Sequence, residues 1–214
     1  MKAVLCKAYC KPTELVTENT SPLSAKPGQV IVDMKAAGVN FADSLIIQGK
    51  YQFKPPFPFS PGLEGAGVIR QLGPGVTQFK PGDRVMVHPM ASGACAEQLA
   101  IDTATTWQIP AQRDCSTAAG LCITYGTSYH ALKDRARLKP GETLLVLGAA
   151  GGVGLTAVEL GKVMGAKVIA AASTPEKLAL CQQYGADETI NYTTEDLRER
   201  TKQLTGGEGV DVVY

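Results

Sequence analysis

The chain has 214 residues, of which 44% are hydrophobic and 19% charged, and its formal net charge is +1. This composition is typical of one or two globular domains, and the near-zero charge argues against a nucleic-acid binder or a protein held on an anionic membrane. No apolar run approaches the roughly 18 residues that cross a bilayer, and the N-terminus lacks the apolar core of a signal peptide.

Six cysteines are scattered along the chain without a CxxC pair. This usage indicates free thiols in a reducing compartment rather than a disulfide framework or a zinc ribbon. We therefore expect a cytoplasmic protein, or a mitochondrial one if a transit segment has been removed.

Up to about residue 109, short apolar or alternating runs are separated by Pro-Gly turns. Such runs predict β-strands, at Gln29–Met34, Gly67–Leu72 and Arg84–His88 among others. A small helix is expected at Asn40–Gln48. This part of the chain, residues 1–120, is therefore predicted to be a barrel-like β-domain.

From about residue 114 the pattern becomes an alternation of helices and apolar strands. A helix is expected over Ser116–Arg135, with a break near Tyr125-Gly126. Strand–helix pairs follow at Thr143–Leu147 and Val153–Met164, at Lys167–Ala172 and Glu176–Tyr184, and at Glu188–Asn191 and Glu195–Leu204. Alternation of this kind predicts βαβ units, and hence an α/β fold whose second domain, residues 121–214, is a doubly wound parallel sheet.

The last five residues, Val210–Tyr214, read as the beginning of a fourth apolar strand. A doubly wound dinucleotide fold has six strands, and an open central strand invites pairing with other chains. We therefore expect residues 1–214 to be part of a longer protein and, as a separate polypeptide, to be inactive.

A glycine-rich turn follows the strand predicted at Thr143–Leu147 and opens a helix. In a nucleotide site of this kind one glycine lets backbone amides approach a pyrophosphate, and another lets helix and strand pack closely. Gly151 and Gly154 are assigned these two functions, although Ala149 replaces the first glycine of the usual pattern. The nucleotide contacts are expected from Ala149, Ala150, Gly151, Gly152, Val153 and Gly154.

The end of the second strand indicates which dinucleotide binds. NAD-binding folds place an acidic residue there for the ribose hydroxyls, whereas this chain has Ala171, Ala172 and Ser173. Ser173, Thr174 and Lys177 can hydrogen-bond or neutralise a 2′-phosphate. The sequence therefore favours NADPH, although a helix cap and a solvated lysine are the plain alternatives for these residues, and Glu176 stands close by.

With these motifs in place, the chain resembles the medium-chain dehydrogenase/reductase superfamily, in its quinone oxidoreductase branch. The resemblance covers essentially all residues and is carried by Gly38–Asp43, Pro61–Gly67, Phe79–Val85 and Ala149–Gly154. It implies a chaperonin-10-like N-terminal domain, a Rossmann domain and, for the whole protein, a homodimer.

The branch follows from the absence of zinc ligands. In the zinc alcohol dehydrogenases a cysteine stands where this chain has Asn40 and a histidine where it has Leu63, and neither residue present is a zinc ligand of the usual kind. We therefore expect no metal. Zinc-free members deliver hydride from NADPH to a conjugated carbonyl, either a quinone or an enone.

The resemblance also assigns residues to this reaction. Asn40 matches a position that contacts both cofactor and substrate, Asp43 is the polar partner of the local hydrogen-bond network, and Tyr51 matches a tyrosine that lines the pocket. Tyr192 matches a residue near the 2′-phosphate, with an ordinary strand-end tyrosine as the alternative. Leu45 stands where bacterial members often have tyrosine, so the acceptor stays open.

Two other functions remain open on the same scaffold. One is an enoyl-thioester or alkenal reductase, and the other a catalytically silent nucleotide-binding protein. His88 and His130 have no carboxylate partner visible in the sequence, and neither is assigned to a proton relay.

Overall fold

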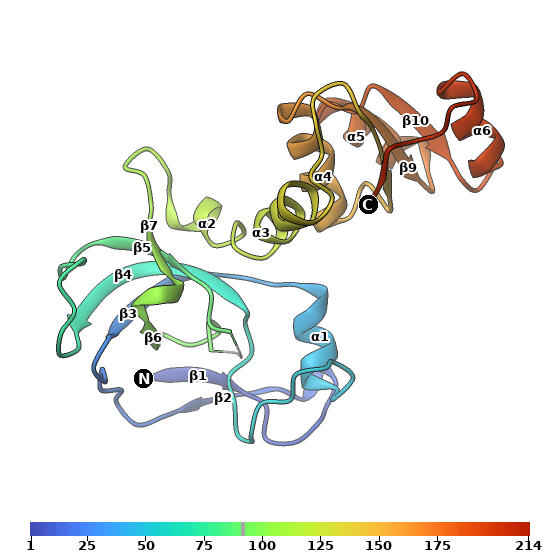
Figure 1. Ribbon diagram of the computed structural model, residues 1–214. Helices are drawn as coiled ribbons and strands as arrows, with labels where there is room; N and C mark the ends of the chain where they lie inside the picture. The colour runs from blue at the N-terminus through green and yellow to red at the C-terminus, as the bar shows by residue number, and fades with distance from the viewer. Residues whose placement is uncertain (91–92) are drawn as a thin grey trace. The chain divides into compact units, whose positions relative to one another are not determined.

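The computed structural model describes residues 1–90 and 93–214, which form two compact units, Met1–Ile123 and Thr124–Tyr214 (Figure 1). An antiparallel five-stranded sheet organises the first unit, and a parallel four-stranded sheet organises the second. The α/β class expected from the sequence is therefore confirmed.

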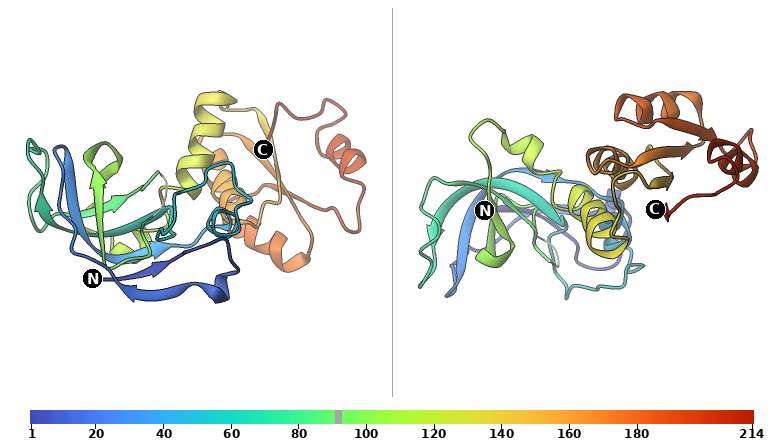
Figure 2. Two further views of the ribbon diagram at one scale, coloured as in Figure 1. Left: turned by 90° about the horizontal axis from the view of Figure 1, so that it is seen from below. Right: turned by 45° about the horizontal axis from the view of Figure 1, so that its top comes forward.

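The five-stranded sheet of the first unit has the strand order β6-β3-β4-β5-β7, and β1 and β2 form a separate antiparallel pair. The strands are β1 (Lys2–Leu5), β2 (Val16–Asn19), β3 (Gln29–Gly38), β4 (Glu64–Leu72), β5 (Arg84–Val87), β6 (Gln98–Asp102) and β7 (Thr106–Gln108). Their register shifts twice between β3 and β4, and such irregularities bend a sheet, as the curved strands in Figure 2 show. The bend encloses a core that includes Val30, Val32, Ile69, Val85 and Val87.

Strands β3 and β4 are longer than their apolar patterns predicted. The extra residues of β4 are Glu64–Ala66, which stand in a glycine-rich motif of low strand propensity. A Cβ on Gly67 would lie 2.2 Å from Asp33 O, and a Cβ on Gly65 would lie 2.8 Å from Ala36 O. The backbone of β3 thus passes too close to these positions to admit a side chain, which explains why glycine stands in this strand.

The helices of the first unit are short. They are α1 (Phe41–Ile47) and α2 (Cys115–Ala118), with 3-10 turns η1 (Pro12–Glu14) and η2 (Thr103–Thr105). The expected helix at Asn40–Gln48 is confirmed. The single helix expected from Ser116 is wrong in its break, because α2 ends at Ala118 and the next helix begins at Thr124.

The cause of this break lies in a buried carboxylate. The amide of Ile123 donates to Glu64 Oε2 at 2.8 Å, 59 residues away, instead of to a carbonyl of the preceding helical turn. Tyr125-Gly126, where the break was expected, lies inside a helix. A long-range side-chain contact thus decides where this helix begins.

The second unit has the strand order β10-β9-β8-β11, and all neighbouring strands are parallel. Its elements are α3 (Thr124–Tyr129), the π-helical turn η3 (His130–Arg135), β8 (Thr143–Leu147), α4 (Gly152–Val163), β9 (Lys167–Ala172), α5 (Pro175–Gln183), β10 (Glu188–Asn191), α6 (Leu197–Leu204) and β11 (Val212–Val213). This order is 3-2-1-4 of a doubly wound sheet, so the order reverses between β8 and β11.

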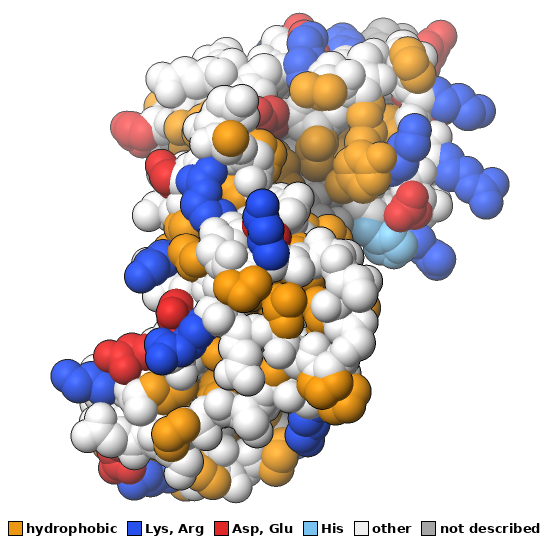
Figure 3. Space-filling model, turned by 90° about the vertical axis from the view of Figure 1, so that its left-hand side faces the viewer, with side chains coloured by type: hydrophobic (Ala, Val, Ile, Leu, Met, Phe, Trp, Pro, Cys, Tyr) orange, Lys and Arg blue, Asp and Glu red, His pale blue; other side chains and the backbone are white. Residues whose placement is uncertain are grey.

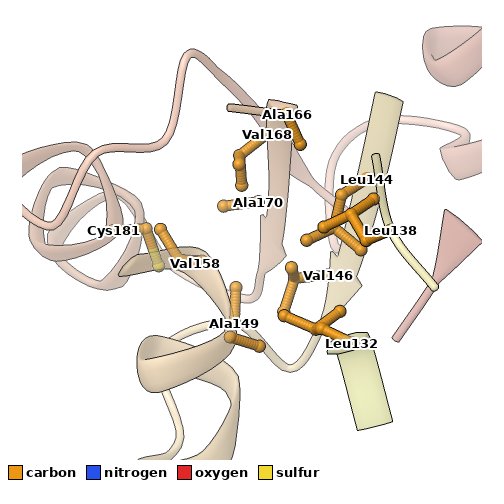
Figure 4. Packing of buried hydrophobic residues seen from close by; sticks show 11 residues of the cluster. Leu132, Leu138, Leu144, Val146, Ala149, Val158, Ala166, Val168, Ala170 and Cys181 are labelled. Carbon is orange, nitrogen blue, oxygen red and sulfur yellow. The ribbon is translucent and has the colours of Figure 1, made fainter. Parts of the chain in front are cut away.

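Apolar side chains of β8 and β9 form one core with α4 and the π-helical turn. Figure 4 shows Val146 of β8 and Leu132 of η3 meeting beside Ala149, while Val168 and Ala170 of β9 lie near Val158 and Cys181. Each of these side chains is less than 1% exposed. Continuous apolar strands are expected of a parallel sheet that is covered on both faces.

The helices of the second unit begin within two residues of their expected starts. Helices α4 and α5 begin one residue earlier than expected, at Gly152 and Pro175, and α6 begins two residues later, at Leu197. The N-cap of α5 is Thr174, whose side chain accepts from Lys177 N, and the N-cap of α6 is Asp196, which accepts from Glu199 N at 2.8 Å. In both helices the side chain of the N-cap residue satisfies one of the first amides.

Candidate functional site

The glycine-rich turn joins the carboxyl end of β8 to the start of α4. Gly151 is the N-cap of α4, and its amide donates to Gly148 O at 2.9 Å. A Cβ on Gly154 would lie only 2.5 Å from Gly148 O, so this buried glycine lets the helix pack against the turn. The amide of Ala149 donates to Ala171 O at 3.0 Å, which fixes the turn beside the end of β9.

The outer side of this turn is open to solvent. Gly151, Gly152 and Val153 are exposed, whereas Ala149 is buried and Ala150 half-buried against the core. The first amides of a helix have no partner within the helix, and the helix dipole adds partial positive charge at that end. The six predicted residues therefore form one continuous turn, in which the amides of Gly152 and Val153 at the exposed start of α4 can face a phosphate group.

The residues predicted at the ends of β9 and β10 also come together. Lys177 Nζ donates to Ser173 Oγ at 3.1 Å, and Lys177 N donates to Thr174 Oγ1 at 3.4 Å. Thr193 Oγ1 donates to Ser173 O at 3.2 Å, which places its neighbour Tyr192, 46% exposed, at the same sheet edge. The Lys177 ammonium and the Ser173 hydroxyl thus lie beside each other, and Tyr192 follows at the same sheet edge.

In the first unit, the beginning of α1 holds a buried carboxylate. Asn40 is the N-cap of α1, and Asp43, 8% exposed, accepts from Asn40 N at 2.8 Å and from Gly62 N at 3.1 Å. Burial raises the pKa of the Asp43 carboxyl, and hydrogen bonds from the amides of Asn40, Gly62 and Leu63 oppose that rise. Asp43 therefore ties the start of α1 to the loop before β4.

A second buried carboxylate lies next to the first. Glu64 is 1% exposed; its Oε1 accepts from Asn40 Nδ2 and its Oε2 from Ile123 N, both at 2.8 Å. Because a carboxylate only accepts, the amide nitrogen of Asn40 must face Glu64, and the orientation of Asn40 is fixed. Burial and then the charge of Glu64 raise the pKa of the Cys122 thiol to about 12. A Cβ on Gly38 would lie 2.6 Å from Glu64 Oε1, so glycine makes room for this side chain.

Tyr51 packs against an apolar cluster of the first unit. It is half-buried, and the buried members of this cluster are Cys6, Ile46, Ile47, Phe59 and Leu63. The structure therefore joins Asn40 and Asp43 by a hydrogen bond, whereas Tyr51 has an apolar setting that includes residues of α1.

The two histidines have different partners. His88 Nδ1 lies 2.7 Å from Leu63 O, and His130 Nδ1 lies 2.8 Å from Asp134 Oδ2. The expectation that His130 has no carboxylate partner is wrong, since Asp134 stands one turn further along the π-helical segment. Both side chains are exposed, so this is a surface contact rather than part of the Asp43–Glu64 array.

Sequence reasoning did not single out Glu64 as a site residue. The signal that could have found it is an acidic residue in an otherwise apolar strand, flanked by Leu63 and Gly65, because a buried carboxylate needs dedicated donors. The donors themselves, Asn40 and Ile123, are distant in sequence and become visible only in the fold.

The surface charges, the possible metal ligands and the helix lengths bear in turn on the binding of a nucleic acid, a metal ion or a membrane. On the face seen in Figure 3, lysine and arginine side chains lie scattered among acidic and apolar ones. Among residues 1–90 and 93–214, three or more His, Cys, Asp or Glu side chains nowhere gather as a group that could hold a metal ion. No helix in the described part of the chain is long and apolar enough to cross a membrane.

Comparisons with known proteins agree with both units. Residues 26–131 match the family described as Alcohol dehydrogenase GroES-like domain, and residues 152–214 match the family described as Zinc-binding dehydrogenase. Quinone oxidoreductase-like protein 2 homolog of Nematostella vectensis is 42% identical over 99% of this chain and 58% of its own length. The chain spans about 60% of the curated relatives it matches.

Solved structures give the same result. A probable oxidoreductase from Mycobacterium abscessus is 41% identical, with a TM-score of 0.90 over 100% of this chain and 68% of that one. Escherichia coli quinone oxidoreductase complexed with NADPH is 35% identical, with a TM-score of 0.93 over 100% of this chain and 65% of that one. The chain belongs to the medium-chain dehydrogenase/reductase superfamily, in its quinone oxidoreductase branch.

Proposed function

We propose that the protein containing this chain is an NADPH-dependent reductase of quinones or related conjugated carbonyls, which transfers hydride directly and without zinc. Because the chain spans about 60% of its curated relatives, turnover is proposed for a protein of the relatives' length. The adenosine and pyrophosphate half of the cofactor site is proposed for residues 1–214.

The second unit supplies the groups that fit a dinucleotide phosphate. The amides of the exposed residues Gly152 and Val153, in the first turn of α4, suit a pyrophosphate. The close packing of Gly154 against Gly148 O keeps that turn tight. The order of the parallel strands reverses between β8 and β11, next to this turn, which is where such folds bind their ligands.

The single observation that carries the proposal is the set of groups at the ends of β9 and β10. Lys177 Nζ lies 3.1 Å from Ser173 Oγ, and the last residues of β9 are alanines rather than an acid. Thr174 and Tyr192 complete this edge. A 2′-phosphate finds an ammonium group and hydroxyl donors here, so NADPH fits better than NADH.

The first unit supplies the groups proposed to act on the acceptor. Asn40 is held by Glu64, and the start of α1 is held by Asp43, so the Asn40 amide keeps one orientation without reorganising. We assign Asn40 to contact with cofactor and substrate, Asp43 and Glu64 to positioning, and Tyr51 to the wall of the acceptor pocket. NADPH, when bound, supplies the hydride, while these residues orient the acceptor and offer polar contacts to its oxygen.

The donor set explains why the mechanism is proposed without zinc. The position of one zinc ligand is Asn40, whose amide nitrogen donates to Glu64, and that of the other is Leu63, which packs in the apolar cluster. An amide engaged in this way and an aliphatic side chain do not coordinate zinc. Elemental analysis of purified protein tests this directly, since stoichiometric zinc would contradict the proposal.

The decisive experiment is a steady-state assay on the whole protein. NADPH and NADH are compared with an ortho-quinone as acceptor, and an alkenal replaces the quinone in a parallel series. We expect quinone reduction with NADPH preferred over NADH. Equal kcat/KM with both cofactors would contradict the NADPH assignment. Turnover of the alkenal but not of the quinone would show that the acceptor is an enone.

A further inference from the structure

A pair of thiols lies outside the Asn40–Glu64 array. Cys6 and Cys10 are separated by three residues, and their Sγ atoms are 3.8 Å apart. Both are free thiols. The two sulfurs of a disulfide bond are about 2.05 Å apart, so the Sγ atoms of Cys6 and Cys10 must approach by about 1.75 Å to form one.

The backbone is hydrogen-bonded at both cysteines. Cys6 N donates to Phe59 O at 2.8 Å, Phe59 N donates to Cys6 O at 3.1 Å, and Cys10 N donates to Ile47 O at 2.9 Å. The three residues between the cysteines, 7–9, are exposed and make only surface side-chain contacts, such as that of Lys7 with Glu18. The anchors therefore keep the two sulfurs near each other.

The two thiols differ in accessibility. Cys6 is 0% exposed, whereas Cys10 is half-buried at the edge of the same apolar cluster. Burial, followed by the hydrogen bond with Cys10, raises the pKa of the Cys6 thiol to about 11. A solvent-borne oxidant therefore reaches Cys10 first, and Cys6 is placed to react with the product.

We propose that Cys6 and Cys10 form a reversible, peroxide-sensitive dithiol site. The Cys10 thiolate attacks hydrogen peroxide and breaks its O–O bond, giving a Cys10 sulfenic acid and, with one proton, water. The Cys6 sulfur then attacks the Cys10 sulfur; the S–S bond forms, the S–O bond breaks, and the Cys6 proton leaves with the hydroxyl group as a second water. One peroxide is reduced to two waters, and two thiols are oxidised to one disulfide.

The position of Lys7 gives a direct assay. Trypsin cleaves after Lys2 and Lys7, so the two cysteines fall in different peptides, residues 3–7 and a longer peptide that begins at Ala8. The chain is treated with stoichiometric hydrogen peroxide, quenched with catalase, alkylated and digested. We expect the two peptides to be recovered joined, lighter by two hydrogen atoms than their sum, and separate after dithiothreitol.

Thiol titration under denaturing conditions gives a second, independent measurement. The six thiols of the native chain are expected to fall by two, to four, on oxidation. Cys10→Ala is expected to lose none of its five thiols, while the matched control Cys115→Ala loses two. Recovery of peptide 3–7 unlinked from the oxidised native chain, or equal thiol loss in the two variants, would overturn the proposal.

Discussion

The two units build their candidate sites by different means. In the second unit the phosphate turn is made of backbone, from the seven consecutive residues Gly148 to Gly154. Gly151 N donates to Gly148 O three residues away, and Ala149 N donates to Ala171 O of the neighbouring strand. In the first unit the site is made of side chains from three separate segments, and Glu64 joins Asn40 and Ile123. The backbone site depends on glycines that allow close packing. The side-chain site depends on buried carboxylates having their hydrogen-bond donors.

The largest effect is expected from removing the carboxylate at the centre of the first site. In Glu64→Ala, Asn40 Nδ2 and Ile123 N, which belong to half-buried residues, lose their acceptor inside the protein. A donor left unsatisfied costs about 1–3 kcal/mol when it is shielded from water. We expect the free energy of unfolding to fall by about 2–6 kcal/mol, measured as the urea midpoint. Glu18→Ala, at an exposed position in β2, is the matched control, and an equal loss in both variants would show that Glu64 is an ordinary acidic residue.

The same chemical change at two glycines of the second unit separates backbone geometry from helix propensity. Gly154→Ala places a Cβ 2.5 Å from Gly148 O, whereas Gly126→Ala meets nothing within 4 Å. We expect Gly154→Ala to destabilise the chain by about 1–3 kcal/mol through overpacking and to weaken NADPH binding. Gly126→Ala is expected to stabilise by about 0.5–1 kcal/mol.

Calorimetric melting and fluorescence titration with NADPH measure both effects. If both variants raise, or both lower, the free energy of unfolding, the close packing of α4 against the turn is not what requires glycine at position 154.

A smaller effect is expected at the ends of β9 and β10, where side chains rather than backbone choose the cofactor. Lys177→Ala removes the ammonium group beside Ser173. Because Lys177 is exposed, we expect the preference for NADPH over NADH to fall by about 1 kcal/mol, below the ~1.5–3 kcal/mol of buried charged hydrogen bonds. Isothermal titration with both dinucleotides measures it. Lys133→Ala is the control at an exposed lysine of the same unit, and unchanged selectivity in Lys177→Ala would remove this residue from the cofactor site.

The same difference between local and long-range contacts explains which elements could be predicted from the sequence. The strands Thr143–Leu147 and Lys167–Ala172 have the predicted bounds, because a buried parallel strand is a largely apolar run between local turn signals. Glu188–Asn191 also has its predicted bounds, although Ile190 is its one buried residue. The start of β4 and the break before Thr124 could not be predicted in the same way. The start of β4 depends on the close approach of β3 to Gly65 and Gly67. The break before Thr124 involves Glu64, which accepts from Ile123 N 59 positions away, and no local pattern encodes either pairing.

The smallest effect tests whether the charge of Glu64, and not only its hydrogen bonds, acts on its surroundings. Burial first and the Glu64 charge second raise the pKa of the Cys122 thiol to about 12, and only the thiolate reacts with alkylating agents. Glu64→Gln removes the charge and keeps most of the volume. The pKa of Cys122 therefore falls, its thiolate fraction at a given pH below that pKa rises, and we expect iodoacetamide to modify Cys122 about two- to fivefold faster at pH 9. The buried Cys6 of the same unit reports any general loosening, since opening of the unit would accelerate both cysteines while loss of the charge accelerates Cys122 alone. An unchanged Cys122 rate in a folded Glu64→Gln protein would mean that Glu64 acts in this site only as a hydrogen-bond acceptor.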